Sequence, residues 1–206
     1  MKKFILAVVS AFFLIVSVNA ETFESVCKNL SEHPNMTGNF SQIKTISAVN
    51  RSMKSSGTFI FSLDGIMWKT EKPFPSTMVV GMTSVKQTLA NGKETVIDAS
   101  SNQIFTSIST TLSAMFSGNS DVLQNNFDVD FNFSGSDWTA VLSPKDNMVK
   151  KILTSLSISG KATATSADLN SIVMKESSGD TITYNFSDQK YPKELNADEK
   201  SYFSSK

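Results

Sequence analysis

The spacing of apolar residues changes near the start of the chain from the period of a helix to that of a strand. Four apolar residues recur at i, i+3, i+4 and i+7: Phe23, Val26, Cys27 and Leu30. This spacing predicts an amphipathic helix over residues 22–33, which Pro34 would end. From Gly38 onward apolar and polar residues alternate, which is typical of strands with one buried face.

Residues 38–99 contain six predicted strands. Asp64-Gly65 and Asn91-Gly92 are strong hairpin signals, because both pairs favour the left-handed backbone that tight turns need. The predicted strands cover residues 38–47, 57–63, 66–73, 76–82, 84–90 and 93–99. Strands joined by such short turns indicate an antiparallel meander.

The strand pattern stops between residues 104 and 125. Four apolar residues there fall at i, i+4, i+7 and i+8: Ile108, Leu112, Met115 and Phe116. This stripe predicts a short amphipathic helix. A second short helix is predicted at residues 120–125.

Alternation resumes in the segment FDVDFNF, which places four apolar side chains on one face: Phe127, Val129, Phe131 and Phe133. The predicted strands here are 125–133, 137–143, 150–160, 167–176 and 181–187, with turns at Ser134–Ser136 and Ser177–Asp180. A sheet of about eleven antiparallel strands must curl, because a flat sheet of that size exposes its edges. We therefore predict a mainly β fold with some α, in which the curled sheet forms a barrel or half-barrel. The tail from Asp188 onward is polar, and its few apolar or aromatic anchors are Tyr191, Pro192, Tyr202 and Phe203.

The first 20 residues have the composition of a secretory signal peptide. Two lysines precede an apolar run of 15 residues, Phe4 to Val18, and the V-N-A at its end fits cleavage after Ala20. The alternative is an uncleaved membrane anchor, but the run is shorter than the roughly 20 residues that cross a bilayer. We expect cleavage to leave residues 21–206 as a single exported domain.

The charge of this expected mature chain argues against a nucleic-acid partner. Residues 21–206 carry 17 basic and 19 acidic side chains, a net charge of −2, and Arg51 is the only arginine in the sequence. Nucleic-acid binding requires clustered positive charge. Because Cys27 is the only cysteine, an internal disulfide is excluded, and we interpret it as a buried apolar residue on a helix face.

The residues that usually carry catalysis or bind metals do not form a recognisable set. His33 is the only histidine and precedes a proline, so we interpret it as a surface or capping residue. The sequence has no G-x-S-x-G elbow and neither of the glycine-rich phosphate-binding motifs. Asp128 and Asp130 share one strand face, which we interpret as solvated rather than as a cation site. We predict no enzyme activity, no metal and no cofactor.

Large flexible or aromatic side chains are abundant, with 15 phenylalanines and 9 methionines in the whole sequence. Such residues suit a pocket that accepts varied apolar shapes. The composition taken alone favours the alternative, an ordinary barrel core. The apolar strand faces alone leave both interpretations open.

Several short motifs, taken in their order, resemble a known family. The segments GNFSQ (38–42), GTFIF (57–61) and DGIMWKTEKPFPS (64–76) resemble the opening of the LolA-type periplasmic lipoprotein carriers. The residues that carry this resemblance are Phe40, Gln42, Gly57, Trp68 and Pro73. Two later segments, DWTAVLSPKD (137–146) and LSISG to TITYNF (156–186), resemble the second half of a LolA-like branch. The resemblance covers nearly all of residues 21–206.

This resemblance implies an unclosed β-barrel of about eleven strands, with short helices as a lid over an apolar cavity for acyl chains. The lid candidates are the helices at 22–33 and 108–116. The family carries an arginine near the turn before the tryptophan strand that bonds to the closed lid. The matching stretch SLDGIMW has no arginine; Asp64 stands near that place, and Arg51 lies too far upstream to replace it.

From the alternation we predict which side chains line the cavity. The set comprises Phe59, Phe61, Trp68, Met78, Val80, Leu89, Phe127, Val129, Phe131, Leu142, Leu156 and Ile158 from the sheet, and Leu112 and Met115 from the lid. The alternation does not decide which face of each strand is concave.

The function that follows is a monomeric periplasmic carrier, which shuttles a lipoprotein or other lipidated cargo from the inner toward the outer membrane. Its partners would be the acylated cargo, an inner-membrane donor and an outer-membrane acceptor. Three alternatives stay open: a carrier of a non-protein lipid such as a glycolipid or acylated pigment, a module that binds a hydrophobic peptide or protein, and a hydrolase of an envelope component.

Overall fold

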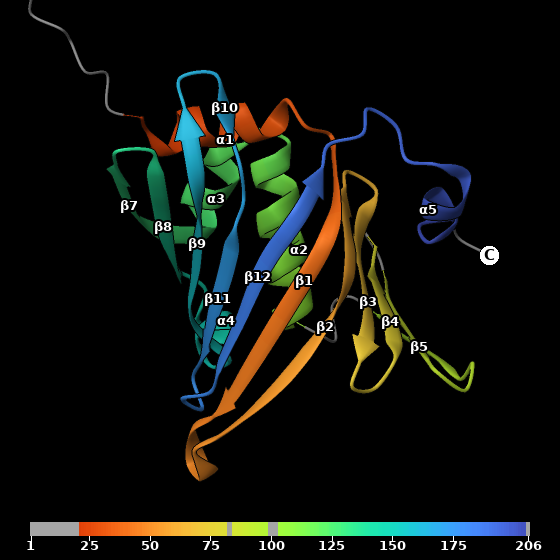
Figure 1. The fold of residues 1–206 in the computed structure, drawn as a ribbon. Coiled ribbons are helices and arrows are strands. Elements are labelled where there is room, and N and C mark those ends of the chain that lie inside the picture. Colours follow the sequence, from red (N-terminus) through yellow and green to blue (C-terminus); the bar gives the residue numbers. More distant parts are fainter. Residues whose placement is uncertain (1–20, 82–83, 99–102, 205–206) are drawn as a thin grey trace, which may run out of the picture.

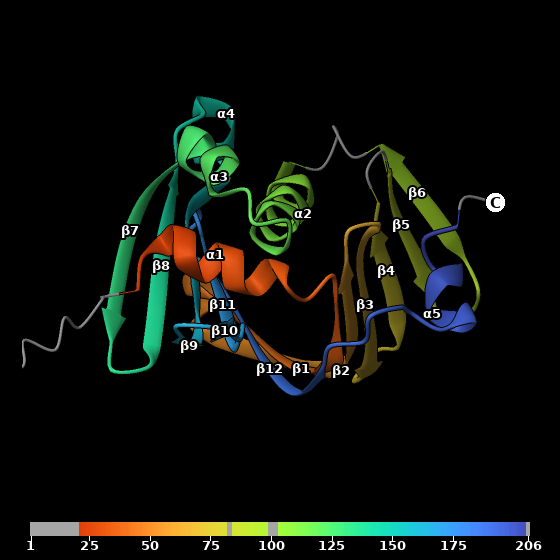
Figure 2. The same cartoon turned by 90° about the horizontal axis from the view of Figure 1, so that it is seen from above.

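A twelve-stranded antiparallel sheet that curls around three helices makes up most of the fold (Figures 1 and 2). The computed structural model describes residues 21–81, 84–98 and 103–204. The predicted signal peptide, residues 1–20, lies outside this range. The strand order is β6-β5-β4-β3-β2-β1-β12-β11-β9-β8-β7, and β10 pairs with β9 off this path. The end strands β6 and β7 do not pair, so the sheet is an unclosed half-barrel, as predicted.

The first half of the sheet is a six-stranded meander. Its strands are β1 (Asn35–Ile46), β2 (Arg51–Ser62), β3 (Gly65–Lys72), β4 (Ser76–Val80), β5 (Ser84–Leu89) and β6 (Glu94–Asp98). The 3-10 turn η1 (Ser47–Val49) joins β1 to β2, and Asn50 follows it in the left-handed conformation, at a φ of 48°. Both predicted hairpin turns are confirmed, with Gly65 and Gly92 at positive φ.

The second half of the sheet follows the helices. Its strands are β7 (Phe127–Ser134), β8 (Asp137–Pro144), β9 (Leu153–Thr163), β10 (Ser166–Ala167), β11 (Ser171–Glu176) and β12 (Thr181–Lys190). β12 pairs with β1 and so joins the two halves. The extra strand relative to the predicted eleven is the two-residue β10, which the prediction had merged with β11.

Three helices lie inside the curve of the sheet: α1 (Phe23–Ser31), α2 (Gln103–Phe116) and α3 (Ser120–Asn126) (Figure 2). A capping box formed by Thr22 and Ser25 begins α1. The helices predicted at 22–33, 108–116 and 120–125 are thereby confirmed. The side chain of Ile108 lies outside the described residues. Two further short helices are α4 (Asn147–Lys150) and α5 (Ala197–Ser201), and neither was predicted.

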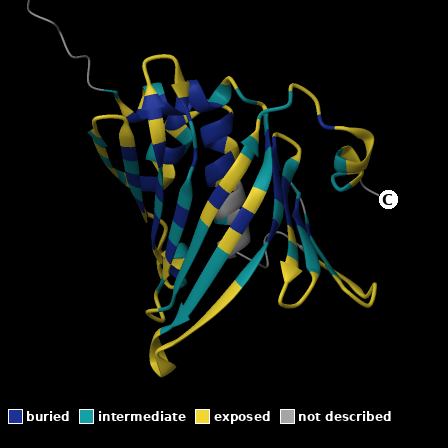
Figure 3. Cartoon of the chain, viewed as in Figure 1, coloured by how far each residue is buried: buried dark blue, intermediate teal, exposed yellow. Residues whose placement is uncertain are grey.

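Alternate residues of the strands separate into two apolar clusters on the two faces of the sheet. The larger cluster lies between the concave face and the helices, and it includes Phe59, Phe61 and Trp68. The smaller cluster contains Ile60 and Met67, which occupy the alternate positions of β2 and β3 and so face the convex side. The C-terminal tail covers it through Leu195, Tyr202 and Phe203. In Figure 3 the buried residues concentrate around the helices, and the strand connections at the lower end are exposed.

Candidate functional site

An apolar groove opens on the concave face, across strands from both halves of the sheet. It has a volume of about 330 Å³ and is lined by residues of β1, β3, β4, β11 and β12. Six lining residues are apolar or aromatic: Phe40, Trp68, Met78, Met174, Ile182 and Tyr184. The volume lies at the lower end of the range of roughly 300–1,000 Å³ for ligand sites.

Aromatic rings form a continuous layer from the groove to the lid. The ring of Tyr184 lies 5.9 Å from the rings of both Phe40 and Trp68, measured between centroids. The Trp68 ring contacts Phe61 at 5.6 Å, and Phe61 contacts Phe116 of α2 at 6.0 Å. These separations are those of favourable aromatic pairs. The groove is therefore an extension of the space in which α2 packs.

The end of the groove near the turn between β11 and β12, the lower end in Figure 1, is polar. Lys44 Nζ lies 3.6 Å from Glu176 Oε1 and 3.9 Å from Asp180 Oδ2. These three side chains are partly exposed, so the ion pairs contribute little stability. Gln42 also lines this end and accepts a hydrogen bond from Ser55 Oγ at 3.1 Å. The groove thus has an apolar interior and a polar mouth, which suits an amphipathic ligand.

One hydrogen-bond donor in the groove wall finds no acceptor. Trp68 is only 8% exposed, and its Nε1–H has no partner among the described residues. A buried N–H without a partner is costly, whereas an acceptor brought by a ligand would satisfy it. The neighbouring Tyr184 stays protonated, because burial raises its pKa to about 12. Trp68 and Tyr184 are therefore two neutral groove residues that carry hydrogen-bond donors, and the donor atom of Trp68 is buried.

Apolar contacts dominate the attachment of the helical lid to the sheet. Leu112, Met115 and Phe116 of α2 are buried in the larger cluster. In α1, Phe23 contacts Phe131 of β7 at 6.0 Å. A hydrogen bond also joins α1 to the sheet: Asn29 Nδ2 donates to the carbonyl oxygen of Thr163 in β9 at 3.0 Å.

The resemblance implies an arginine that bonds to the lid, and Arg51 is the only arginine in the sequence. Arg51 begins β2 at the lower end of the sheet and is exposed, and Asp64 is exposed in the turn between β2 and β3. Neither side chain forms an ion pair within the described residues. A lid attached mainly by apolar packing can separate from the sheet without breaking a salt bridge.

The structure brings most of the predicted cavity residues together. Ten are buried in the larger cluster: Phe59, Phe61, Trp68, Val80, Leu112, Met115, Phe127, Leu142, Leu156 and Ile158. Three are partly buried and pack against it: Met78, Val129 and Phe131. Leu89 lies apart, because it is 41% exposed at the end of β5. Trp68 and Met78 line the groove itself, whereas the other buried residues fill the space between sheet and lid.

The groove residues that come from the centre of the sheet were not among the predicted cavity residues. Phe40 belongs to β1, Met174 to β11, and Ile182 and Tyr184 to β12. The signal was present in the alternating segment TITYNF and in GNFSQ. The sequence does not show that β1 pairs with β12, and this pairing places Phe40 opposite Phe186 and Gln42 opposite Tyr184.

The potentially reactive side chains outside the groove make structural contacts. His33 stacks on Tyr191, with ring centroids 4.2 Å apart. Cys27 is fully buried, and burial, with a smaller contribution from Glu24, raises the pKa of its thiol to about 12, so the thiolate is suppressed. No cluster of three or more potential metal ligands occurs within residues 21–81, 84–98 and 103–204.

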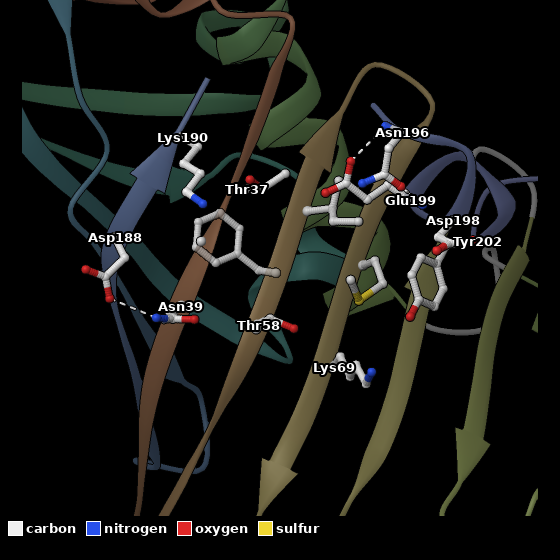
Figure 4. Close-up of a pocket in the computed structure, with 14 residues that line it drawn as sticks. Thr37, Asn39, Thr58, Lys69, Asp188, Lys190, Asn196, Asp198, Glu199 and Tyr202 are labelled. Carbon is white, nitrogen blue, oxygen red and sulfur yellow. Dashed lines mark hydrogen bonds between the residues drawn. The ribbon is translucent and has the colours of Figure 1, made fainter. Parts of the chain in front are cut away.

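A second cavity, of about 380 Å³, lies on the convex face beside α5 (Figure 4). Both signs of charge line it, including Lys69, Lys190 and Asp188. Asn39 Nδ2 donates to Asp188 Oδ2 at 2.8 Å, and Asn196 caps α5 through the backbone N–H of Glu199. This mixed polar lining does not suit an acyl chain, so the candidate site remains the concave groove.

The fold and the groove define a class: a half-barrel whose concave face, beneath a helical lid, offers an apolar site. A model of the family described as "Outer membrane lipoprotein carrier protein LolA" matches residues 31–202. The match spans well over half of the sequence, and the chain belongs to the LolA family. LolA family proteins are periplasmic carriers rather than enzymes, and membership makes this chain a lipid-binding carrier in general terms.

Three solved structures are similar to this chain at low sequence identity, and the first of them shows the same fold. A DUF1329 family protein from Desulfovibrio piger is 10% identical with a TM-score of 0.51, over 88% of this chain and 94% of that one. A LolA superfamily protein from Nitrosomonas europaea is 10% identical with a TM-score of 0.47, over 90% and 99%. A domain named for outer membrane lipoprotein sorting, from Vibrio parahaemolyticus, is 10% identical with a TM-score of 0.49, over 86% and 95%. A search of curated proteins found no match. None of the described helices is long and apolar enough to span a membrane.

Proposed function

We propose that this protein is a periplasmic carrier that holds the acyl chains of a lipoprotein or other lipidated cargo against its concave face. On this proposal, it moves the cargo from the inner toward the outer membrane. The observation that carries the proposal is the groove, which runs from a polar mouth into the aromatic layer beneath α2. Such a site would shield the hydrocarbon and leave the polar part of the cargo at the mouth.

The energetics of acyl burial suit a reversible carrier. Each methylene kept from water contributes about 0.8 kcal/mol, so a sixteen-carbon chain gains on the order of 12 kcal/mol in a dry site. In this structure α2 buries Leu112, Met115 and Phe116 against the sheet. A cargo chain must displace part of this packing, which lowers its net affinity and favours release.

The size of the groove sets a requirement on the lid. A space of about 330 Å³ is at the lower limit for a ligand site, and a cargo with two or three acyl chains needs more. We therefore infer that α2 moves away from the sheet when such a cargo binds. The apolar attachment of the lid supports this motion, since no ion pair within the described residues joins α2 to the sheet.

The unpartnered donor of Trp68 favours an acylated cargo over a plain hydrocarbon. An ester or amide carbonyl that reached the buried Nε1 of Trp68 as the lid moved would accept a hydrogen bond from it. Ester- and amide-linked chains are the chemistry that lipoproteins and many glycolipids share. This argument does not separate the two cargo classes, and the polar mouth is compatible with both.

The experiment compares a palmitoyl ester of glycerol with its alkyl ether analogue, which lacks the carbonyl, by equilibrium binding to wild type and Trp68→Phe. Wild type is expected to bind the ester about fivefold more tightly than the ether, the equivalent of one hydrogen bond of about 1 kcal/mol. Trp68→Phe is expected to lose that preference and retain affinity for the ether. Equal binding of both ligands by both proteins would reject the carbonyl contact. Failure of the folded wild type to bind either ligand would reject the carrier function itself.

A further inference from the structure

One end of the half-barrel gathers five segments that are far apart in the sequence. Because neighbouring strands are antiparallel, every second connection falls at the same end of the sheet. The segments are 44–54, 71–75, 89–96, 145–151 and 175–180, and we call them the lower rim, after their place in Figure 1. Hydrogen bonds connect some of them directly: Ser47 N–H donates to Asp180 Oδ1 at 3.0 Å, and Ser177 N–H donates to the carbonyl of Ile152, next to the rim, at 3.0 Å.

The lower rim carries a charge opposite to that of the rest of the molecule. Its segments hold nine basic and five acidic side chains, a net charge of +4. The other positions of residues 21–206 hold eight basic and fourteen acidic side chains, a net charge of −6. Eight of the nine basic residues are exposed, and Arg51, Lys54 and Lys72 form no ion pair within the described residues. The folded chain is therefore electrically polarised from end to end.

The lower rim also carries most of the exposed large apolar side chains. Seven such side chains are exposed in the described residues, and six belong to the rim: Val49, Met53, Phe74, Leu89, Val96 and Met148. Phe74, in the connection between β3 and β4, is 82% exposed. The seventh, Leu63, lies in the turn between β2 and β3 at the opposite end. Single exposed apolar residues are ordinary, but their concentration at one end of the molecule is not.

The mouth of the groove opens at the lower rim. Lys44 and Glu176 belong both to the groove lining and to the rim segments. From them the groove leads toward Phe40 and Trp68, under the lid. Anything that binds the rim would therefore sit over the entrance to the acyl-chain site.

We propose that the lower rim docks on the surface of an anionic lipid bilayer, with the groove mouth facing the lipid headgroups. The rim combines two features that promote binding to such a surface. Lysine and arginine are attracted to anionic headgroups, and apolar side chains interleaved with them enter the boundary between headgroups and acyl chains. The net charge of −6 elsewhere repels the same surface, so only the rim end can approach it.

An acidic protein partner is the other occupant that positive charge would suit. The apolar residues favour the bilayer, because they are spread over four of the five rim segments, and insertion at a bilayer surface does not need a single side chain that fills a partner's pocket. Docking would let an acyl chain pass between bilayer and groove with little exposure to water.

The test is co-sedimentation of residues 21–206 with vesicles, at low and high salt. One set of vesicles contains equal parts of phosphatidylcholine and phosphatidylglycerol, and the other contains phosphatidylcholine alone. The charge variant is Arg51→Glu with Lys54→Glu. Its matched control is Lys28→Glu with Lys193→Glu, which makes the same change in net charge at exposed positions of the opposite end. Phe74→Ser and its control Leu63→Ser test the apolar contribution in the same way.

We expect wild type to bind the anionic vesicles, and high salt to weaken this binding. Removing one basic residue weakens such binding about fivefold, so the rim charge reversal should reduce it at least 25-fold. Phe74→Ser should also weaken it, whereas both control variants should bind like wild type. Equal loss in rim and control variants would overturn the proposal, since it would show a response to net charge alone. Absence of vesicle binding at low salt would also overturn the bilayer proposal and would favour an acidic protein as the partner of the rim.

Discussion

Replacing Met78 by glutamate places a charge in the wall of the groove while sparing the fully buried core. Met78 lies on the concave side of β4, opposite Trp68 on β3, and is only partly buried. The neighbouring residue Thr77 points to the other face of the same strand. Thr77→Glu is therefore a matched control, with the same charge on the same strand.

The expected loss follows from the hydrocarbon that the carboxylate would expose. A hydrated carboxylate at position 78 would keep about three methylenes of a bound acyl chain in contact with water. At about 0.8 kcal/mol for each methylene, the binding free energy falls by about 2.4 kcal/mol, which raises Kd about 60-fold. Because Met78 is partly exposed, the cost to folding is smaller, about 1–2 kcal/mol.

The assay is equilibrium binding of a palmitoyl ligand, with urea unfolding of the same samples to confirm the fold. Met78→Glu should unfold cooperatively at a slightly lower urea concentration and bind about 60-fold more weakly. Thr77→Glu should bind like wild type. Wild-type affinity in a folded Met78→Glu protein would refute the groove as the acyl site, and so would an equal loss in Thr77→Glu.

Three further results are expected. Gly160→Ala should lower the free energy of unfolding by about 3 kcal/mol or more, because a Cβ there would lie 1.8 Å from the carbonyl oxygen of Asp168; an unchanged urea midpoint would contradict this. Cys27, the only thiol, is fully buried in α1, so an acyl ligand that displaces the lid should speed its labelling by a thiol reagent, and a ligand-independent rate would argue against lid motion. Burial raises the pKa values of Cys27 and Tyr184 from 9.0 and 10.0 to about 12, so the unfolded chain loses these protons at a lower pH than the folded chain does. The free energy of unfolding should therefore be full below about pH 9 and fall as the pH rises toward 12. A free energy of unfolding that stays constant over this pH range would contradict the burial.

The regular part of the fold could be predicted because its strands have one buried face. FDVDFNF is the clearest case: Phe127 is buried, Val129, Phe131 and Phe133 are partly buried, and the polar residues between them are exposed. Glycine-containing turns then fixed the hairpins. The first part of β2 was missed because residues 51–54 are exposed and show no apolar alternation, although their backbone pairs with β1 throughout.

The elements that sequence reasoning missed depend on contacts between distant residues. The four-residue α4 and the five-residue α5 are too short to show a helical period. The tail around α5 packs on the convex face through Leu195, Tyr202 and Phe203, and nothing local reveals that partner. The short β10 likewise owes its conformation to pairing with β9.

The candidate site was predictable in composition but not in position. In GTFIF, Phe59, Ile60 and Phe61 are all buried, because the lid covers one face of β2 and the C-terminal tail covers the other. Alternation therefore could not identify the concave face there. The groove lies where β1 meets β12, two strands that stand at opposite ends of the sequence. Only the sheet order brings Phe40 and Tyr184 to the same wall.

Native mass spectrometry of the protein purified from its own host without detergent, followed by lipid extraction, would show directly whether the protein carries an acylated molecule. We expect a bound acylated molecule in wild type and its loss, with the fold retained, in Met78→Glu. Extracted ligand would also distinguish a lipoprotein from a glycolipid. A folded wild-type protein that carries no lipid and binds no apolar dye would refute the carrier function.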